Sequence, residues 1–523
     1  MPNFKTDYSN QNMFVPVIID EQLIPGTIEY AISHIVDNHL DLSLFDEHYC
    51  NDKNGAAAYP PSIMLKIIFY AYSLGMLSSR RIERACINNV TFMCLSGDVR
   101  PHFTTIAAFI AKMKDTIEPL FTQVLMICDE QGLIGRNMFA IDGCKISSNA
   151  SKEWSGTHEE LRRKKEKLER ASKRIIERHQ SQDTLPNEVV EQDLKQKQKL
   201  DNSANKIGKF LASTQDKLGS NNKPIKSNIT DNDSAKMTTS KGTIQGYNGI
   251  AITDDKHQII LHSQVWGSVG EQQTLKPAVL ALKAQLNKLP NSVEHTTKFT
   301  ADSGFHSKAN LKFTADSGFH SKANLKFLAE TPYDCYIADT AFRSRNPLFQ
   351  SSETYQTEQA KKRKKRSKTG KTCYPISMFE FDQDAMTCRC PAGNMMRLSS
   401  KNAVISGERG AQFCDYLNDC RNCVHQPQCM RKPPGKQQGR QVFFIYKNTK
   451  DFDHMQAMKD KIDSPEGRRQ YSKRLGCVEP VFGNITVNKQ MNRFTLRGRE
   501  KVNAQWAMFS MLHNIEKLRN HIH

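Results

Sequence analysis

The 523-residue sequence lacks several features that would each indicate a special class of protein. No stretch approaches the ~20 apolar residues of a membrane-spanning helix. The best candidate, Met64 to Leu77, is too short and contains Lys66. Only 27 Gly and 20 Pro exclude a collagen-like or low-complexity chain. The first ten residues, MPNFKTDYSN, show no basic segment before an apolar run, so no signal peptide is predicted. We therefore expect a cytoplasmic protein without a membrane partner.

Negative charge is in deficit. The 74 Lys+Arg oppose 55 Asp+Glu, which leaves a formal net charge of +19. A clustered excess of positive charge favours a polyanionic partner, and nucleic acid is the usual one. The hydrophobic content of 38% is enough for a folded core. At roughly 100–200 residues per domain, the length suggests about three domains, or one large domain with insertions.

The first 135 residues show the pattern of short helices. Pro61 precedes an apolar-periodic run, and Ser78-Ser79 can cap a basic segment that contains Arg80 and Arg81. Thr104-Thr105 can cap a further helix, 106–114. Short helices with a basic stretch are typical of a helix-turn-helix DNA binder, and the alternative is an ordinary helical bundle.

A long polar segment occupies residues 151–235. Thr157-x-x-Glu160 is a capping box, and Leu161, Leu168 and Ile175 recur every seven residues along a Lys/Arg-rich helix. A second helix is expected over about 187–214. Together they predict a helical hairpin inserted into a larger fold, with either a solvated charged face or a DNA-contacting one.

Acidic residues end two predicted strands of the flanking segments. Asp142 follows the apolar strand 138–141, and Asp302 and Asp316 each follow a Phe-Thr-Ala strand. Glu479 lies on a basic helical stretch. Carboxylates at strand ends and on a facing helix can converge on two divalent metal ions for phosphoryl transfer. The order strand–Asp, hairpin, helix, strand–Asp, helix–Glu is that of a ribonuclease-H-like core.

An identical 14-residue unit, FTADSGFHSKANLK, occupies 299–312 and again 313–326. It is too short for a solenoid, which stacks at least three units of about 20 residues or more, so we read it as a tandem duplication with one redundant copy. If Asp302 is used, the second copy interrupts the following helix. If Asp316 is used, that helix and the next strand stay intact, and the extra residues fall in an upstream loop, which tolerates them better. Asp316 is therefore favoured, and a misregistered, inactive site is a third outcome.

The sequence resembles a DDE transposase of bacterial insertion sequences, in the branch with a cysteine-rich insertion before the final glutamate. The resemblance rests on the N-terminal segments at Pro61–Lys66, Gly75–Glu83 and Phe103–Phe109, on Ile141–Ala150, on Gly246-Tyr247-Asn248 and Ala-Asp-Ser-Gly-Phe-His, and on Tyr471–Arg474, Val478–Ile485 and Phe494–Gly498. It covers nearly the whole chain.

The resemblance implies metal-dependent DNA cleavage and strand transfer with Mg²⁺ or Mn²⁺. Asp142, Glu479 and one of Asp316 or Asp302 would be the metal ligands. Tyr471 and Arg474 would contact DNA phosphate, and an arginine fork suits such bidentate contacts. Further DNA contacts are expected at Arg80, Arg81, Lys489 and Arg497. Related proteins often carry a Lys seven positions after the glutamate, where this sequence has Thr486, with Lys489 nearby.

Six cysteines lie close together in Cys388-x-Cys390, Cys414 and Cys420-x2-Cys423-x5-Cys429. In a cytoplasmic chain such spacing suits tetrahedral Zn²⁺ more than disulfides. The expected ligands are Cys390, Cys420, Cys423 and Cys429, with Cys388, Cys414 and His425 as substitutes. The alternative is a set of reduced, unmetallated thiols. A zinc ion here would be structural. Upstream, the like-charged run 361–366 predicts a basic loop near phosphate.

The predicted fold class is α/β, a ribonuclease-H-like core with insertions. The expected parts are a helical DNA-binding domain (1–135), the first part of the core (136–150 and 236–345), the charged hairpin (151–235), the basic loop and cysteine-rich insertion (346–440), and the C-terminal part of the core with the glutamate (441–523). The expected function is a transposase acting on its terminal inverted repeats. Its partners would be double-stranded DNA and a second copy of itself, in the bacterial cytoplasm at the nucleoid. Two alternatives stay open: an inactive, transposase-derived DNA-binding protein disabled by the duplication, and a zinc-containing nuclease without strand transfer.

Overall fold

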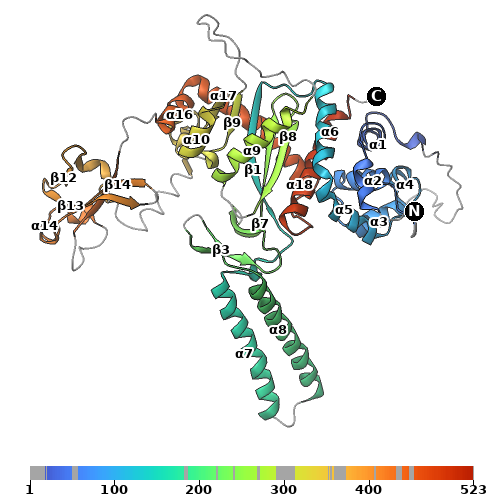
Figure 1. The fold of residues 1–523 in the computed structure, drawn as a ribbon, viewed down its shortest axis with the longest axis horizontal. Helices are drawn as coiled ribbons and strands as arrows, with labels where there is room; N and C mark the ends of the chain where they lie inside the picture. Colours follow the sequence, from blue (N-terminus) through green and yellow to red (C-terminus); the bar gives the residue numbers. More distant parts are fainter. Residues whose placement is uncertain are drawn as a thin grey trace, which may run out of the picture. The chain divides into compact units, whose positions relative to one another are not determined.

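The computed structural model describes residues 18, 20–49, 57–181, 186–219, 222–239, 242–267, 271–289, 312–331, 333–351, 353, 356–357, 373–405, 408–430, 439–446 and 453–521. The fold is a mixed α/β one and divides into two compact units (Figure 1). The first comprises Met1–Asp339 with Met458–His523, and the second comprises Thr340–Ala457. Within the described ranges, no helix combines the length and apolar character that a membrane crossing needs.

A mixed sheet forms the centre of the first unit. Its strand order is β10-β9-β1-β7-β6, with β8 also paired to β7. β1 is antiparallel to β7 and parallel to β9, which is itself parallel to β10. The strands span β1 Met138–Ser147, β6 Ala235–Thr239, β7 Gly242–Asp254, β8 Ile260–Trp266, β9 Lys312–Ala315 and β10 Asp334–Ile337.

Six helices form the N-terminal part of the first unit. They are α1 Ile28–Asn38, α2 Pro61–Ser73, α3 Ser79–Asn88, α4 Val90–Ser96, α5 Phe103–Lys112 and α6 Ile117–Glu130. α2 begins with its proline, as predicted, because a first-turn residue needs no N–H partner. The predicted Thr104-Thr105 cap was wrong: the ring of His102 accepts a hydrogen bond from the Thr104 N–H at 3.4 Å and caps α5.

The helix α18, Arg499–Leu518, joins these N-terminal helices to the sheet. Two of its apolar residues, Trp506 and Phe509, are fully buried. Phe509 stacks on Tyr72 of α2 with ring centroids 4.7 Å apart, and Trp506 Nε1 donates to Ile250 O of β7 at 3.0 Å. The side-chain amide of Asn514 pairs with both backbone groups of Ile260 in β8.

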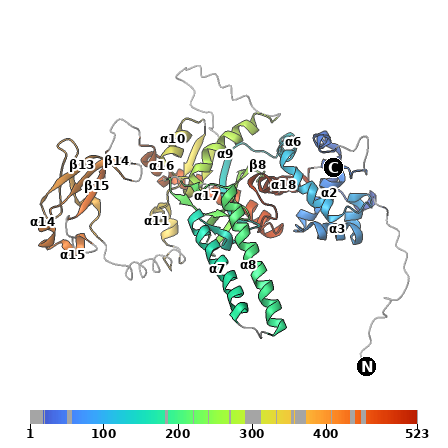
Figure 2. The same ribbon diagram turned by 60° about the horizontal axis from the view of Figure 1, so that its bottom comes forward.

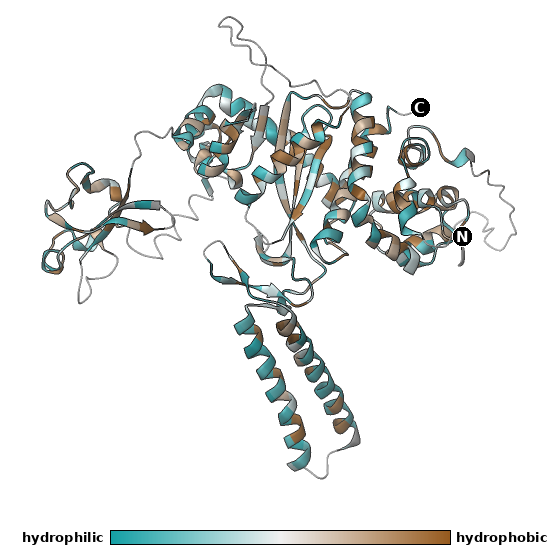
Figure 3. Ribbon diagram, viewed as in Figure 1, coloured by the Kyte–Doolittle hydropathy of each residue, from teal (hydrophilic) through white to brown (hydrophobic). Residues whose placement is uncertain are grey.

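The charged insertion is a helical hairpin, as predicted. It consists of α7 His158–Ser181 and α8 Asn187–Ser213, which lie side by side in both ribbon views (Figures 1 and 2). The capping box is confirmed, because Thr157 N donates to Glu160 and Glu160 N donates to Thr157. The short strands β2 Ser155–Gly156 and β5 Ser227–Asn228 pair at its base. Figure 3 shows α7 as mainly hydrophilic, whereas the central strands carry hydrophobic residues.

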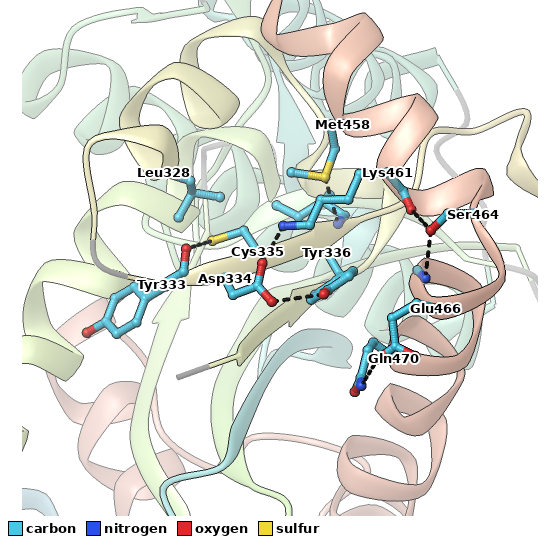
Figure 4. A network of polar contacts seen from close by, with 12 residues as sticks. Leu328, Tyr333, Asp334, Cys335, Tyr336, Met458, Lys461, Ser464, Glu466 and Gln470 are labelled. Carbon is cyan, nitrogen blue, oxygen red and sulfur yellow. Dashed lines mark hydrogen bonds and ion pairs between the residues drawn. The ribbon is translucent and has the colours of Figure 1, made fainter. Parts of the chain in front are cut away.

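The helices that carry the end of the core follow at α16 His454–Asp463 and α17 Pro465–Gly483. Ser464 caps α17 by accepting from Gly467 N at 3.0 Å. Lys461 Nζ bonds Asp334 Oδ1 at 2.5 Å, and Tyr336 OH donates to Asp334 Oδ2 at 2.8 Å (Figure 4). This network fastens the start of α17 to β10 and so sets the position of the helix over the sheet.

The second unit contains a separate antiparallel sheet of order β11-β12-β13-β14-β15. Its strands are β11 Glu380–Asp382, β12 Thr387–Arg389, β13 Met395–Ile405, β14 Glu408–Cys414 and β15 Gln441–Ile445, with the short helices α14 Leu417–Arg421 and α15 Gln426–Cys429. Phe413 and Val442 belong to its buried core. The predicted basic run 361–366 lies outside the described residues.

Candidate active site

Two of the predicted aspartates lie on neighbouring parallel strands. Ile141 of β1 pairs with Ala315, the last residue of β9; Asp142 follows Ile141 within β1, and Asp316 follows Ala315 directly after β9. Parallel strands in register bring such residues to the same edge of the sheet. A long-range strand pairing therefore assembles the pair from segments more than 170 positions apart in the sequence.

Arg474 of α17 bridges the two aspartates. Its Nη1 donates to Asp142 Oδ2 at 2.6 Å, and its Nη2 donates to Asp316 Oδ1 at 3.3 Å. Tyr471, one helical turn earlier, donates its hydroxyl to the same Asp316 oxygen at 3.3 Å. The backbone N–H of Gly143 donates to Asp142 Oδ1 at 2.7 Å. The structure thus brings four predicted site residues together.

The charges of this cluster explain why an arginine lies between the two aspartates. Burial raises the pKa of Asp142, the charge of Arg474 lowers it, and the charge of Asp316 raises it. Burial also raises the pKa of Tyr471 to about 12, so its hydroxyl keeps the proton that it donates. The Arg474 side chain is only 6% exposed, against 22% for Asp142 and 40% for Asp316. The guanidinium supplies, from inside the chain, the positive charge that two close carboxylates require.

Glu479 lies on the outer face of α17. A helix turns about 100° per residue, so Arg474 and Glu479 point about 140° apart around the axis. Glu479 is exposed, whereas Cys477 and Val478 are buried, and Val478 lies in a cluster with Met138 at the start of β1. The structure does not bring Glu479 to the two aspartates, and its predicted role as third ligand stays a prediction.

A different glutamate lies beside the aspartates. Glu271 opens α9, Glu271–Leu286, which packs against the 3-10 turn η5, Ser317–Phe319. A Cβ placed on Gly318 would lie 2.1 Å from Glu271 Oε2, so this carboxylate rests against the backbone just after Asp316. Burial raises the pKa of Glu271, Lys145 lowers it, and both aspartates raise it. Sequence analysis did not single out Glu271, because an acid in the first turn of a helix is commonplace.

The second repeat copy supplies the described strand and helix. β9, η5 and α10, Lys322–Ala329, use residues of copy 313–326, the three residues after it and Lys312, the last residue of the first copy. Leu328, two positions past the second copy, is buried in α10, whereas the residue two positions past the first copy is Thr314. If the first copy formed the strand and helix instead, Thr314 would take the place of the buried Leu328 in the helix. Asp302 and His306 lie outside the described residues.

The predicted DNA contacts differ in their availability. Arg80 and Arg81 are exposed on α3, and Arg80 lies over the Phe103 ring at 4.7 Å. Arg497 is exposed and donates Nε to Asn149 O at 2.8 Å. Lys489 is different: its side chain is 2% exposed and its Nζ pairs with Glu516 at 2.6 Å. This interior ion pair does not offer Lys489 to DNA.

The four predicted zinc ligands line one small cavity of the second unit. Asp415 and His425 line it as well. The Cys, Asp and His residues that line it are Cys390, Cys420, Cys423, Cys429, Asp415, Asp419 and His425. Burial raises the pKa of Cys420 to about 11, although the Arg440 N–H donates to its Sγ at 3.3 Å. Backbone N–H groups of Ala392 and Asn394 likewise lower the pKa of Cys390 against the raising effect of burial. Cys388 and Cys414 are buried in the sheet outside this cavity.

Neither cluster is arranged as a finished metal site. Across the described ranges, no three or more His, Cys, Asp and Glu side chains form a group that could hold a metal ion. In the carboxylate cluster, Arg474 is bonded to both aspartates. In the cysteine cavity, Asp415 bonds Cys420 and Cys390, which lowers its pKa against the raising effect of burial.

Comparisons with known proteins identify two segments. Residues 389–519 match the family of the transposase DDE domain, and residues 18–112 match a transposase domain, DUF772. The first match includes the cysteines, Tyr471, Arg474 and α18, and the second covers α1 to α5. Searches of curated proteins and of solved structures found no match. Two separate segments of the chain thus match transposase families, and these matches support a DDE transposase of an insertion sequence.

Proposed function

We propose that this protein cleaves DNA at the terminal inverted repeats of its insertion sequence and transfers the ends to target DNA. The observation that carries this proposal is the pair Asp142 and Asp316, placed on adjacent parallel strands and joined by Arg474, in a chain with a transposase DDE domain. We further infer a ribonuclease-H-like core. The supporting strand order is β8-β7-β1-β9-β10, with the first three antiparallel and the last three parallel.

The donor set fits a divalent cation such as Mg²⁺ or Mn²⁺, because carboxylate oxygens are hard ligands and both aspartates need a positive partner. Asp142 and Asp316 would hold it, and when bound it would activate the attacking oxygen and stabilise the leaving one. Arg474 and Tyr471 present hydrogen-bond donors at the same edge of the sheet, suited to a DNA phosphate. The exposed Arg80 and Arg81, on a transposase domain, support DNA binding by the N-terminal helices.

We also propose a structural Zn²⁺ held by Cys390, Cys420, Cys423 and Cys429. The backbone N–H groups that donate to Cys420 and Cys390 support this, since such donors favour the thiolate form that zinc requires. The ion would stabilise the second unit and leave no position open for chemistry.

The test is an excision assay in cells on a marker flanked by the gene's own DNA ends. Because the two repeat copies are identical, deletion of either gives the same shortened chain. We expect both the full and the shortened chain to excise the marker, and we expect Asp142→Asn to abolish excision. Loss with Asp316→Asn but not with Asp302→Asn would assign the second copy. Excision only by the shortened chain would favour the inactivated alternative, and silence from both chains would contradict the proposal.

A further inference from the structure

A groove between the two helices of the charged hairpin is lined mainly by lysine and asparagine side chains. It encloses about 530 Å³ of open space. Its lining residues come from both α7 and α8 and are Lys165, Glu169, Asn202, Asn205, Lys206, Gly208 and Lys209. Glu169 is the one acid among these described residues, and its Oε1 pairs with Lys165 Nζ at 3.4 Å. The groove therefore keeps the positive charge of Lys206 and Lys209.

The charge of this groove differs from that of the rest of the hairpin. Elsewhere basic side chains pair with acids, in Arg163–Glu159, Arg178–Asp193, His179–Asp193, Lys195–Glu191, Lys197–Asp201 and Lys226–Glu160. Among the described residues, no acid forms an ion pair with Lys206 or Lys209, and α8 has no acid from Asn202 to its end at Ser213. Like charges one turn apart destabilise a helix slightly. The stability of the hairpin therefore does not account for these two lysines.

Contacts at the base of the hairpin fix the cations of the groove. Lys206 Nζ lies 5.2 Å from the centroid of the Trp154 ring, and Lys164 Nζ lies 4.6 Å from it. An aromatic ring attracts a cation without removing its charge, so the ammonium group keeps N–H donors for another partner. The stem of Lys165 lies beside Gly208, where a Cβ would be 3.4 Å from Lys165 Cε. Both helices thus bring lysines to one place.

We propose that this groove binds the phosphate backbone of double-stranded DNA, with Lys206 and Lys209 as cations and Asn202 and Asn205 as neutral donors. The inference rests on the DNA-directed function proposed above, which brings this polyanion to the chain. Lys206 and Lys209 lie about 4.5 Å apart along the axis of α8, close enough to contact neighbouring phosphates of one strand. Contacts of this kind position DNA and read no sequence. A second copy of the chain fits poorly, because it carries a net charge of +19 itself.

The test measures binding of the full chain to two DNA duplexes of equal length by fluorescence anisotropy, at several salt concentrations without added Mg²⁺. One duplex carries the gene's flanking ends and the other an unrelated sequence. Lys206→Gln with Lys209→Gln removes two phosphate contacts, so the slope of log K against log salt should become shallower by about two. Near about 0.1 M salt, binding should weaken by about tenfold or more, and equally for both duplexes.

Arg163→Gln with Lys195→Gln is the matched control. It removes the same amount of positive charge from the same hairpin, but both side chains are exposed and already paired with acids. Its affinity and salt slope should change much less than those of the groove variant. Thermal melting of both variants identifies a chain that merely fails to fold.

The other outcomes separate the inference from the function beneath it. Equal losses in both double variants would show that only the net charge matters, and unchanged binding in both would remove the hairpin from the DNA; either result overturns the inference. A loss confined to the flanking-end duplex would indicate base reading and overturn a backbone contact. Asp142→Asn should bind both duplexes as the unchanged chain does, so loss of cleavage leaves the inference standing. An unchanged chain that binds neither duplex would contradict the proposed function as well.

Discussion

The carboxylate cluster of the core and the cysteine cavity of the second unit avoid uncompensated negative charge in different ways. In the core cluster, burial raises the pKa of Asp142, and the chain supplies Arg474 as an internal counterion for the two aspartates. The cysteine cavity contains Cys420 and Cys429, and burial raises the pKa of both thiols, which favours their protonated, neutral form without metal. A cation must therefore compete with an arginine in the first region and with protons in the second.

This contrast teaches what each region needs from its surroundings. An arginine can be exchanged for a metal ion or a DNA phosphate, which suits a site that changes partners during a reaction. Thiols that release their protons to solvent when a metal binds form a closed site, which is suited to stabilising a fold. The following variants test that difference, from the largest expected effect to the smallest.

Asp142→Asn should give the largest effect. It removes the charge of a proposed metal ligand while keeping the side-chain shape, and we expect DNA cleavage to fall by about a thousandfold or more, the equivalent of several kcal/mol. Cleavage of end-labelled flanking DNA measures it. Asp384→Asn, an exposed acid of the second unit, is the control. Cleavage that survives in Asp142→Asn would remove the core cluster from catalysis.

The double variant Cys420→Ser with Cys423→Ser should lose zinc and destabilise the second unit. Because binding energy at a structural zinc site is folding energy, we expect its melting temperature to fall by about 10 °C or more. Metal analysis and calorimetry of the full chain measure both quantities. Cys373→Ser, outside the cavity, is the control. Equal zinc content in all three chains would show that these thiols are not ligands.

Arg474→Gln should weaken the metal-free core by about 1–3 kcal/mol, less than the loss of a partner in a fully buried pair, because Asp316 is 40% exposed. Added Mg²⁺ should raise the melting temperature of this variant more than that of the unchanged chain, since no guanidinium then competes. Arg469→Gln, on the same helix but paired with Glu466 at the surface, should show no such gain. Equal Mg²⁺ responses would contradict the competition.

The free energy of unfolding should also depend on pH through a buried histidine of the core. This contribution has to be separated from any loss of zinc at low pH. Burial lowers the pKa of His513 to about 3; its ring bonds Gln258 O and Asn484, each at 3.0 Å. The unfolded chain takes up this proton below about pH 6.5 and the folded chain does not, so stability falls by about 1 kcal/mol per pH unit from there toward pH 3. His513→Gln should flatten that slope in urea titrations, with His454→Gln, at the start of α16, as the comparison. An unchanged slope would exclude His513 as its source.

The sequence predicted the elements whose signal is local. Pro61 opens α2 and the capping box opens α7, both as expected. Asp142 was recognisable because a polar residue follows the apolar stretch 138–141, although the strand β1 continues past it to Ser147. Its meeting with Asp316 followed from the expected order of strands.

The rest depended on contacts between distant segments. Glu271 gains its position from the packing of α9 on η5, and nothing within its own helix indicates that. Lys489 has the charge of a phosphate contact, but Glu516 draws it into the interior. The helical spacing already argues against a shared site for Arg474 and Glu479, because residues five positions apart lie on nearly opposite faces of a helix.

The small pairing of β2 with β5 has a kinetic consequence. β1 must find β7 across the inserted segment, and a long flexible loop makes such a search slow. α7 and α8 can form from local contacts, and β2 and β5 then hold the two ends of the hairpin together. The flexible stretch between Ser147 and Ala235 then becomes several times shorter. This lowers the entropic free-energy cost of closing the loop by about 1 kcal/mol. The insertion thus need not slow the folding of the sheet that it interrupts.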